Sequence, residues 1–311
     1  MNKKVFFRGF VTGIATCILT TVITILLCFC PALNPGLYER ILFLPMKKYP
    51  DPDYGLCISG IKAKDVTFNS LDNKVKLTAR LYDVPQAKQI ILYTHGQGGN
   101  IAHTAYKIKF LVDSGASVLA YDFRGYGKSL GEPHIAQVHE DARAAYDFIL
   151  ANTKYKNSDV ILYGESLGAA ITSDLASKVK SGGVVLESPF TSLAKIAREK
   201  FPVLQIYPDS LNLYPTLTNE SFVKSTHSAP LLIVGADKDI CTPLHHAEYL
   251  YKQATGTKFF LTCKNTNHAV FDVDPKFYCT KLAGFMSYCQ DKENSQALAW
   301  AQSPGIVYSA P

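Results

Sequence analysis

Serine 166 stands in a pattern that can support nucleophilic chemistry. Residues 164–168 read Gly-Glu-Ser-Leu-Gly, and they lie between an apolar run at 160–163 and a helix-forming stretch. In a G-x-S-x-G sequence at such a junction, the glycines permit a sharp turn that exposes the serine hydroxyl. A serine hydroxyl attacks a carbonyl carbon effectively only when a neighbouring base takes its proton. The pattern therefore predicts that Ser166 is a nucleophile and that a base and an acid are supplied from elsewhere in the chain.

Histidine 268 and Asp239 are the predicted base and acid. Where a serine follows such a turn, the acid and then the histidine come later along the chain. Asp239 and His268 each follow an apolar run that predicts a strand, at 231–234 and 259–262. Open α/β sheets place their sites at the carboxyl ends of such strands. Asp237 is the rival acid, because boundaries predicted from a sequence shift by a few residues.

Two backbone N–H groups are predicted to bind the oxyanion that forms during the attack. One belongs to Leu167, at the start of the helix after the serine, where the helix dipole favours negative charge. The other belongs to Gln97, in the glycine-rich loop 95–100 that follows another apolar run. This loop lacks the Gly-Lys-Ser/Thr ending of a phosphate-binding loop. Its first residue, His95, is interpreted as structural.

Strands alternate with helices over most of the chain. Residues 66–68 and 75–81 alternate apolar and polar side chains and predict antiparallel edge strands. After them, short apolar runs alternate with amphipathic stretches such as 140–151. This order predicts an α/β fold with a mostly parallel central sheet flanked by helices. Residues 191–228 interrupt this alternation of strands and helices and are expected to form a small cap. Residues 291–311 are expected to form a loose tail.

The N-terminal stretch 9–33 contains no charged residue. About 20 apolar residues cross a bilayer as a helix, so residues 1–33 are predicted to form a cytoplasmic stub and a transmembrane anchor. Three basic residues precede the apolar stretch: Lys3, Lys4 and Arg8. Positive charge favours the cytoplasmic side, which predicts that the rest of the chain lies on the other side. The alternative is a signal peptide whose cleavage leaves a secreted protein. Residues 34–60 are expected to be a linker.

Four segments resemble a known family: 95–100, 121–129, 164–168 and 187–190. Together with the acid and histidine loops, they resemble the α/β-hydrolases over about residues 66–288. The chain is most similar to the group with one N-terminal membrane anchor that includes protein depalmitoylases and related acyl or lipid hydrolases. The resemblance implies an α/β-hydrolase domain at 61–290 with a Ser-His-Asp triad.

One loop departs from the family pattern. Gly235 and Asp239 are separated by one residue more than is usual in the acid loop. Asp237 therefore stays open as the acid.

The expected reaction is hydrolysis of a carboxylic ester or thioester, of acyl or lipid type, through an acyl-enzyme and without a cofactor or metal. The predicted cap carries apolar side chains that suit an acyl chain: Phe201, Leu204, Ile206, Tyr207, Leu211, Leu213, Tyr214 and Leu217. The alternatives are a serine peptidase of the same fold that cleaves short peptides, and a non-catalytic membrane-tethered interaction protein. The net charge of +6 is not gathered into a basic stripe, which argues against a nucleic-acid partner. The sequence carries no prediction of an oligomeric state.

Overall fold

The computed structural model describes residues 3–51, 54–208, 211, 217–268, 274–303 and 305–309. Its strands are β1 (Leu44–Pro45), β2 (Cys57–Ile58), β3 (Ile61–Lys62), β4 (Lys64–Asn69), β5 (Lys76–Tyr82), β6 (Ile90–Thr94), β7 (Gly98–Gly99), β8 (Ser117–Asp122), β9 (Val160–Glu165), β10 (Gly183–Glu187), β11 (Leu231–Ala236), β12 (Lys258–Cys263) and β13 (Ile306–Ser309). Its α-helices are α1 (Lys3–Cys28), α2 (Pro35–Leu42), α3 (Ala105–Asp113), α4 (Ile135–Asn152), α5 (Leu167–Lys178), α6 (Leu193–Lys200), α7 (Glu220–Lys224), α8 (Leu244–Gln253), α9 (Pro275–Gln290) and α10 (Ser295–Ala301). Two 3₁₀-helices are η1 (Asn157–Asp159) and η2 (Pro202–Ile206).

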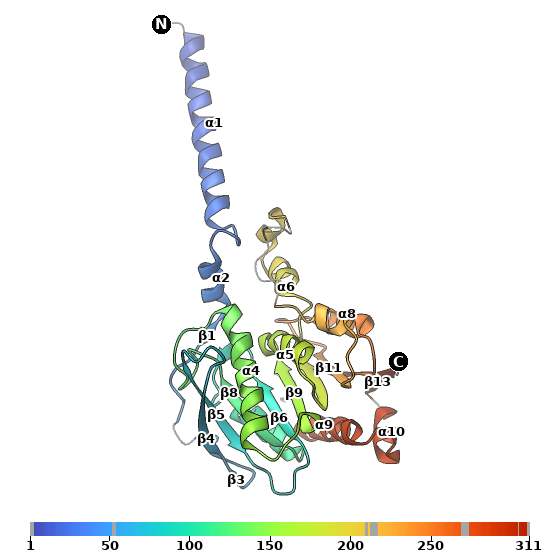
Figure 1. The fold of residues 1–311 in the computed structure, drawn as a ribbon. Helices are drawn as coiled ribbons and strands as arrows, with labels where there is room; N and C mark the ends of the chain where they lie inside the picture. The colour runs from blue at the N-terminus through green and yellow to red at the C-terminus, as the bar shows by residue number, and fades with distance from the viewer. Residues whose placement is uncertain are drawn as a thin grey trace.

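Nine strands of the described chain form the central sheet, in the order β13-β12-β11-β10-β9-β6-β8-β5-β4 (Figure 1). Neighbours from β8 to β12 pair in parallel, whereas β4, β5 and β13 pair antiparallel. The predicted edge strands are β4 and β5. The predicted α/β fold with a mostly parallel sheet is confirmed.

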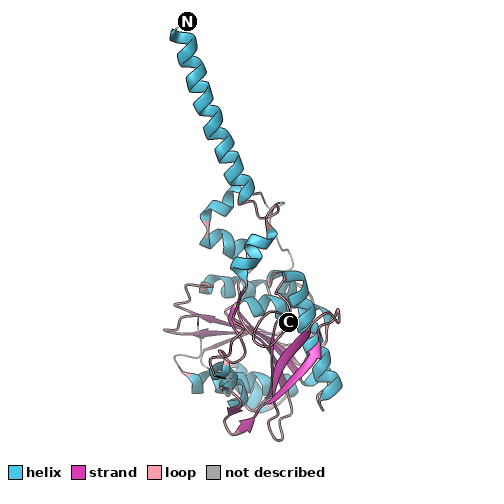
Figure 2. Ribbon diagram, turned by 90° about the vertical axis from the view of Figure 1, so that its left-hand side faces the viewer, coloured by secondary structure: helices cyan, strands magenta, loops and turns pink. Residues whose placement is uncertain are grey.

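Helices cover both faces of this sheet (Figure 2). One face packs against α3, α9 and α10, through side chains such as Ile108, Phe285 and Trp300. The other face packs against α4, α5 and α8. Strands β6, β8, β9, β10 and β11 are buried at every residue. Strands covered on both faces need apolar side chains throughout, and this explains their uninterrupted apolar runs.

The C-terminal segment packs onto the sheet, so the expectation of a loose tail is wrong for its described part. Strand β13 extends the sheet, with Val307 paired opposite Phe260. The ring of Trp300 on α10 is buried against Phe285 and Phe259. Helix α10 has seven residues and β13 has four. Elements this short carry too little periodicity to be predicted from sequence.

The N-terminal helix α1 extends away from the rest of the chain (Figures 1 and 2). Within the described residues, it is the one helix long and apolar enough to cross a membrane, over Phe10–Cys28, and none of that stretch is buried. Its exposed apolar side chains fit the predicted anchor.

The expected linker 34–60 is largely built into the fold. Helix α2 begins with Pro35 in its first turn, where the fixed φ of proline is compatible with a helix. Glu39 on α2 accepts the backbone N–H of Ile135, at the start of α4, at 3.0 Å. Strand β1 pairs in parallel with β7, and Phe43 between α2 and β1 is buried. The term linker is therefore wrong for residues 35–45.

The expected cap divides into two parts. Helix α6 and η2 project from the sheet edge beside α2 (Figure 1). Helix α7 instead belongs to the core, because Phe222 and Val223 are buried with α5 and α8. Leu213 and Tyr214, which were expected to add to the apolar cap, lie outside the described residues.

Candidate active site

Ser166 lies in a tight turn between β9 and α5. Its φ of +55° falls in the left-handed region that residues with a side chain rarely adopt. Its N–H donates to the carbonyl oxygen of Glu187 on β10 at 2.9 Å. A Cβ added to Gly164 would collide with the carbonyl oxygen of Gly168, and one added to Gly168 would collide with that of Thr94. The two glycines of the G-x-S-x-G pattern are thus required by packing.

His268 and Asp239 form a hydrogen-bonded pair. His268 Nδ1 donates to Asp239 Oδ2 at 2.7 Å. Asp239 Oδ1 accepts the N–H groups of Cys241 and Thr242, both at 2.8 Å, and the Thr242 hydroxyl donates to Asp239 Oδ2 at 2.9 Å. Asp237 is exposed and instead accepts a backbone N–H from the loop before His268 at 3.2 Å. The structure therefore brings Asp239, and not Asp237, against the imidazole.

The pair is electrostatically suited to general-base chemistry. Burial of Asp239 opposes its ionisation, but hydrogen bonds from His268 and Thr242 lower the pKa of Asp239 below its ordinary value. Burial of His268 disfavours the imidazolium, but the hydrogen bond to Asp239 and its charge raise the pKa of His268 above the ordinary value. Because Nδ1 donates to the carboxylate, Nε2 of the neutral ring is the free acceptor.

Ser166 and His268 line the same cavity. Among the described residues, no hydrogen bond joins Ser166 Oγ to the His268 ring. A proton transfer between them therefore requires the two side chains to approach. Such contacts are often long in ligand-free enzymes and shorten when substrate binds.

Gly96 and Gln97 lie beside Ser166. A Cβ built on Gly96 would be 3.5 Å from Ser166 Cβ. In the described part of the chain, the backbone N–H groups of Gln97 and Leu167 donate to no protein acceptor. The Leu167 N–H is left free because the first turn of a helix has no intrahelical acceptor. Two unused donors next to a serine hydroxyl can bind an oxygen that gains negative charge.

The loop that carries Gln97 is fixed by the segment after α1. The Gln97 carbonyl oxygen accepts hydrogen bonds from the Tyr126 hydroxyl at 2.7 Å and from the N–H of Leu44 at 3.3 Å. Its side-chain amide donates to the carbonyl oxygen of Ile41 on α2 at 2.9 Å. Sequence reasoning missed this support, because α2 is one short helix and β1 has only two residues.

His95, at the start of this loop, is fully buried. Its Nδ1 hydrogen-bonds to the carbonyl oxygen of Gly96 at 2.8 Å, and its ring packs on Phe123. Burial lowers the pKa of His95 to about 4, so the ring is neutral near pH 7. His95 supports the loop and does not line the cavity.

A buried charge pair lies beneath the nucleophile turn. The Lys107 ammonium group on α3 binds Glu165, the residue before Ser166, and the Tyr93 hydroxyl donates to Glu165 at 2.6 Å. Burial opposes ionisation of Glu165, but the Lys107 charge lowers its pKa below the ordinary value. Burial raises the pKa of the neighbouring Glu187 to about 8. Sequence reasoning missed Lys107, because it is 58 residues away from its partner.

Replacing Lys107 with methionine is expected to destabilise the fold by about 3–5 kcal/mol, because it leaves Glu165 buried without its counter-charge. The side chains of Lys107 and Glu165 are only 5% and 8% exposed. Urea unfolding of the full chain in detergent measures the loss. A Lys107→Met/Glu165→Gln variant, which removes both charges, should recover part of the lost stability. A single variant as stable as the wild type would show that the pair does not hold the turn in place.

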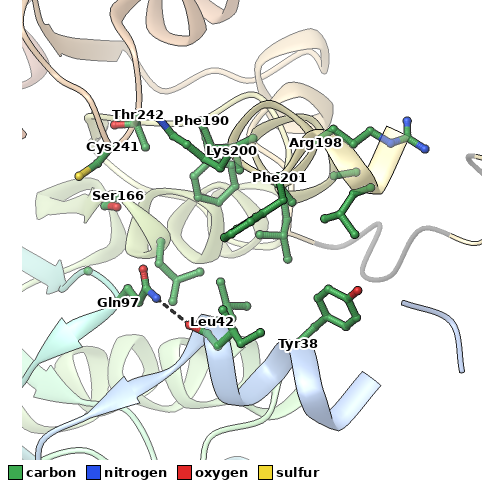
Figure 3. A pocket seen from close by; sticks show the side chains of 18 of the residues that line it. Tyr38, Leu42, Gln97, Ser166, Phe190, Arg198, Lys200, Phe201, Cys241 and Thr242 are labelled. Atoms are coloured by element: carbon green, nitrogen blue, oxygen red, sulfur yellow. Dashed lines mark hydrogen bonds between the residues drawn. The ribbon is translucent and has the colours of Figure 1, made fainter. Parts of the chain in front are cut away.

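The cavity beside Ser166 has a volume of about 670 Å³ and is mostly apolar. Figure 3 shows Ser166, Gln97 and Thr242 at one end, with Leu42 of α2 and Phe201 at the end of α6 forming opposite walls. The other apolar lining residues include Leu37, Ile41, Phe190, Leu193, Ile196, Val203 and Leu204. A cavity of this kind can hold a hydrocarbon chain next to the serine.

Within the described residues, two groups of side chains have the composition of a metal site: Glu199, His245 and His246, and Asp239, Cys241 and His268. In the first group, His246 Nδ1 accepts the N–H of Thr191 at 3.2 Å, so Nε2 carries the proton and binds Glu199 at 3.1 Å. In the second group, His268 Nδ1 is already bonded to Asp239. Both groups are satisfied as hydrogen-bonded clusters, and no reaction step is assigned to a metal.

Comparison with known families gives a match over residues 85–226 to the family described as "Serine aminopeptidase, S33". The uncharacterized protein Rv2307c of Mycobacterium tuberculosis is 32% identical over 178 residues, which cover 57% of this chain and 62% of that protein. The match thus spans less than two thirds of that relative. The uncharacterized membrane protein YNL320W of Saccharomyces cerevisiae is 29% identical over 217 residues, which cover 68% of this chain and 72% of that protein.

Among solved structures, the esterase Pf2001 of Pyrococcus furiosus superposes with a TM-score of 0.64 at 21% sequence identity. The superposition covers 79% of this chain and 97% of the esterase. At this identity the likeness shows a shared fold, the α/β-hydrolase fold. It therefore agrees with the strand order and with the family match.

Proposed function

Because the chain has the α/β-hydrolase fold and its residues 85–226 match a family of serine hydrolases, we propose that it is a serine hydrolase that cleaves carboxylic ester or thioester bonds of acyl substrates. One observation carries the proposal. The His268–Asp239 pair faces the cavity into which the turn at Ser166 projects. Acyl transfer from a carbonyl substrate to water makes use of a strained serine turn, an oriented imidazole and two free N–H donors together.

The proposed reaction proceeds through an acyl-enzyme. Ser166 Oγ attacks the carbonyl carbon while His268 Nε2 takes the hydroxyl proton. The N–H groups of Gln97 and Leu167 bind the oxyanion of the tetrahedral intermediate. When the intermediate collapses, His268 gives the proton to the leaving alcohol or thiol. Water then attacks the acyl-enzyme with His268 as base, and the free acid and Ser166 are released.

Asp239 acts through the imidazole. By accepting the hydrogen bond from Nδ1, it keeps Nε2 free to accept a proton and stabilises the imidazolium that results. The backbone N–H groups of Cys241 and Thr242 hold the carboxylate in this position. Thr242 is therefore proposed as a positioning residue.

Serine peptidase activity is the second candidate, because the matched family is described as an aminopeptidase. An aminopeptidase must bind the ammonium group at the end of its substrate, and a free carboxylate near the serine usually does this. Among the described lining residues, Glu165 is the one acid, and Lys107 already neutralises it. The apolar cavity and the paired acid favour an acyl substrate.

A substrate panel tests this choice. The full chain in detergent is given 4-nitrophenyl esters of increasing acyl length and aminoacyl 4-nitroanilides. We expect kcat/KM to rise by about fourfold per CH₂ until the chain fills the cavity, since each buried CH₂ contributes about 0.8 kcal/mol. Faster cleavage of the aminoacyl anilides than of every ester would support the peptidase instead. Hydrolysis of neither class by folded protein would favour a non-catalytic interaction protein.

The proposed location is a membrane, with Lys3, Lys4 and Arg8 on the cytoplasmic side and the catalytic domain on the other side. Contacts at the end of α1 support an uncleaved anchor over a signal peptide. Tyr207 donates its hydroxyl proton to the carbonyl oxygen of Leu26 at 2.8 Å. Cleavage near residues 28–30 would remove this acceptor.

A further inference from the structure

The cavity beside Ser166 extends to the end of the apolar helix α1. Its lining includes Phe29 and Pro31, which directly follow α1, together with Leu37 on α2 and Val203 on η2. The reacting end of the cavity is thus connected to the point where α1 would leave a bilayer.

Hydrogen bonds hold both walls of the cavity to the last turn of α1 and the residue that follows it. The Tyr38 hydroxyl on α2 donates to the carbonyl oxygen of Phe29 at 2.5 Å. The Tyr207 hydroxyl, just after η2, donates to the carbonyl oxygen of Leu26 at 2.8 Å. The Asn34 amide before α2 donates to the carbonyl oxygen of Cys28 at 2.8 Å. These contacts fix the cavity close to the C-terminal end of α1, where the chain would leave the bilayer.

Large apolar side chains surround this end of the cavity and face outward. Five of them form the rim: Leu33, Ile41, Phe201, Val203 and Ile206, with exposed fractions of 51–63%. Exposed apolar patches of this kind mark surfaces that contact a membrane or another protein. The rim begins five residues after α1 ends at Cys28, and α1 itself must be covered by lipid. The same lipid can therefore cover the rim.

Charge near the rim also fits a bilayer. Arg198 on α6 lines the cavity wall (Figure 3), and its guanidinium group donates to the carbonyl oxygen of Tyr207, just after η2, at 2.7 Å. Basic side chains just outside the hydrocarbon region are attracted to phosphate headgroups.

We propose that the rim is immersed in the bilayer interface and that the substrate is a long-chain acyl ester resident in that bilayer. Its chain enters sideways between α2 and the α6–η2 segment, and its carbonyl carbon reaches Ser166. A chain that moves from hydrocarbon directly into an apolar cavity stays out of water, whereas passage through solvent would cost free energy for each exposed CH₂. This inference rests on the proposed serine hydrolase function and specifies its substrate class.

The test compares two esters with the same leaving group in the same vesicles. Full-length protein is placed in phosphatidylcholine vesicles and given either water-soluble 4-methylumbelliferyl butyrate or bilayer-embedded 4-methylumbelliferyl palmitate. The test variant is Leu33→Glu/Ile206→Glu, since both side chains belong to the rim but do not line the cavity. The control is Leu150→Glu, an exposed apolar residue at the far end of α4.

We expect the rim variant to lose at least about tenfold in palmitate hydrolysis, because a carboxylate resists entry into the bilayer interface. Its butyrate hydrolysis should stay within about twofold of the wild type, which also shows that it is folded. Equal palmitate hydrolysis by the rim variant and the control would overturn the proposed entry route. So would wild-type protein that cleaves butyrate but not palmitate, whereas wild-type protein that cleaves neither ester would overturn the serine hydrolase proposal itself.

Discussion

Ser166→Ala is expected to lower kcat for ester hydrolysis by about 10⁴- to 10⁶-fold, because it removes the hydroxyl that forms the acyl-enzyme. The variant should fold normally, since alanine tolerates the left-handed backbone at φ +55° about as well as serine does. Stopped-time assays with the butyrate ester measure the loss, and thermal unfolding in the same detergent checks the fold.

Ser188 provides a matched control for this substitution. It also follows a central strand, has a φ of +45° and is buried. It does not line the cavity. Ser188→Ala should therefore keep kcat within about threefold of the wild type. A loss of activity at Ser188 as large as at Ser166 would mean that the loss at Ser166 does not identify its hydroxyl as the nucleophile.

Asp239→Asn is expected to lower kcat by about 10⁴-fold, because the amide favours the tautomer in which Nε2 of His268 carries the proton. The matched control is Asp237→Asn. Asp237 accepts only loop N–H groups and is exposed, so its replacement should change kcat by less than about threefold. If Asp237→Asn proved the more damaging substitution, the acid would be misassigned.

The same pair of variants has a pH signature. His268 acts as a base only when neutral, so activity rises as pH passes upward through its pKa. Asp239 raises that pKa above the ordinary value, which places the acidic limb of the wild-type kcat/KM profile at correspondingly higher pH. Removing the carboxylate charge in Asp239→Asn should move the limb to lower pH, whereas Asp237→Asn should leave it in place.

In the candidate site, the sequence predicted the features that depend on local geometry. The turn at Ser166 could be predicted because close backbone contacts require glycine at positions 164 and 168. The positions of the Gln97 and His268 loops could be predicted because each loop follows a buried strand. The choice between Asp239 and Asp237 could not be made locally, since only one residue separates them and only the folded loop places one carboxylate against the imidazole.

Contacts between segments far apart in the chain could not be predicted from the sequence. The segment after α1 is rich in proline and tyrosine, which led to the prediction of a linker. Yet Ile41 and Leu44 hold the Gln97 loop through backbone groups that carry no sequence signal. The Lys107–Glu165 pair joins a helix to a distant turn, and a lysine on a helix usually predicts a solvated face. Strand β13 forms only because the edge of β12 is available to it.

The central claim is that Ser166 is the nucleophile, and mass spectrometry of a fluorophosphonate-labelled peptide tests it most directly. Full-length protein is labelled in its membrane, digested and sequenced. We predict a covalent adduct on Ser166, absent from Ser166→Ala and strongly reduced in His268→Ala. An adduct on a different residue, or none on folded wild-type protein, would contradict the assignment.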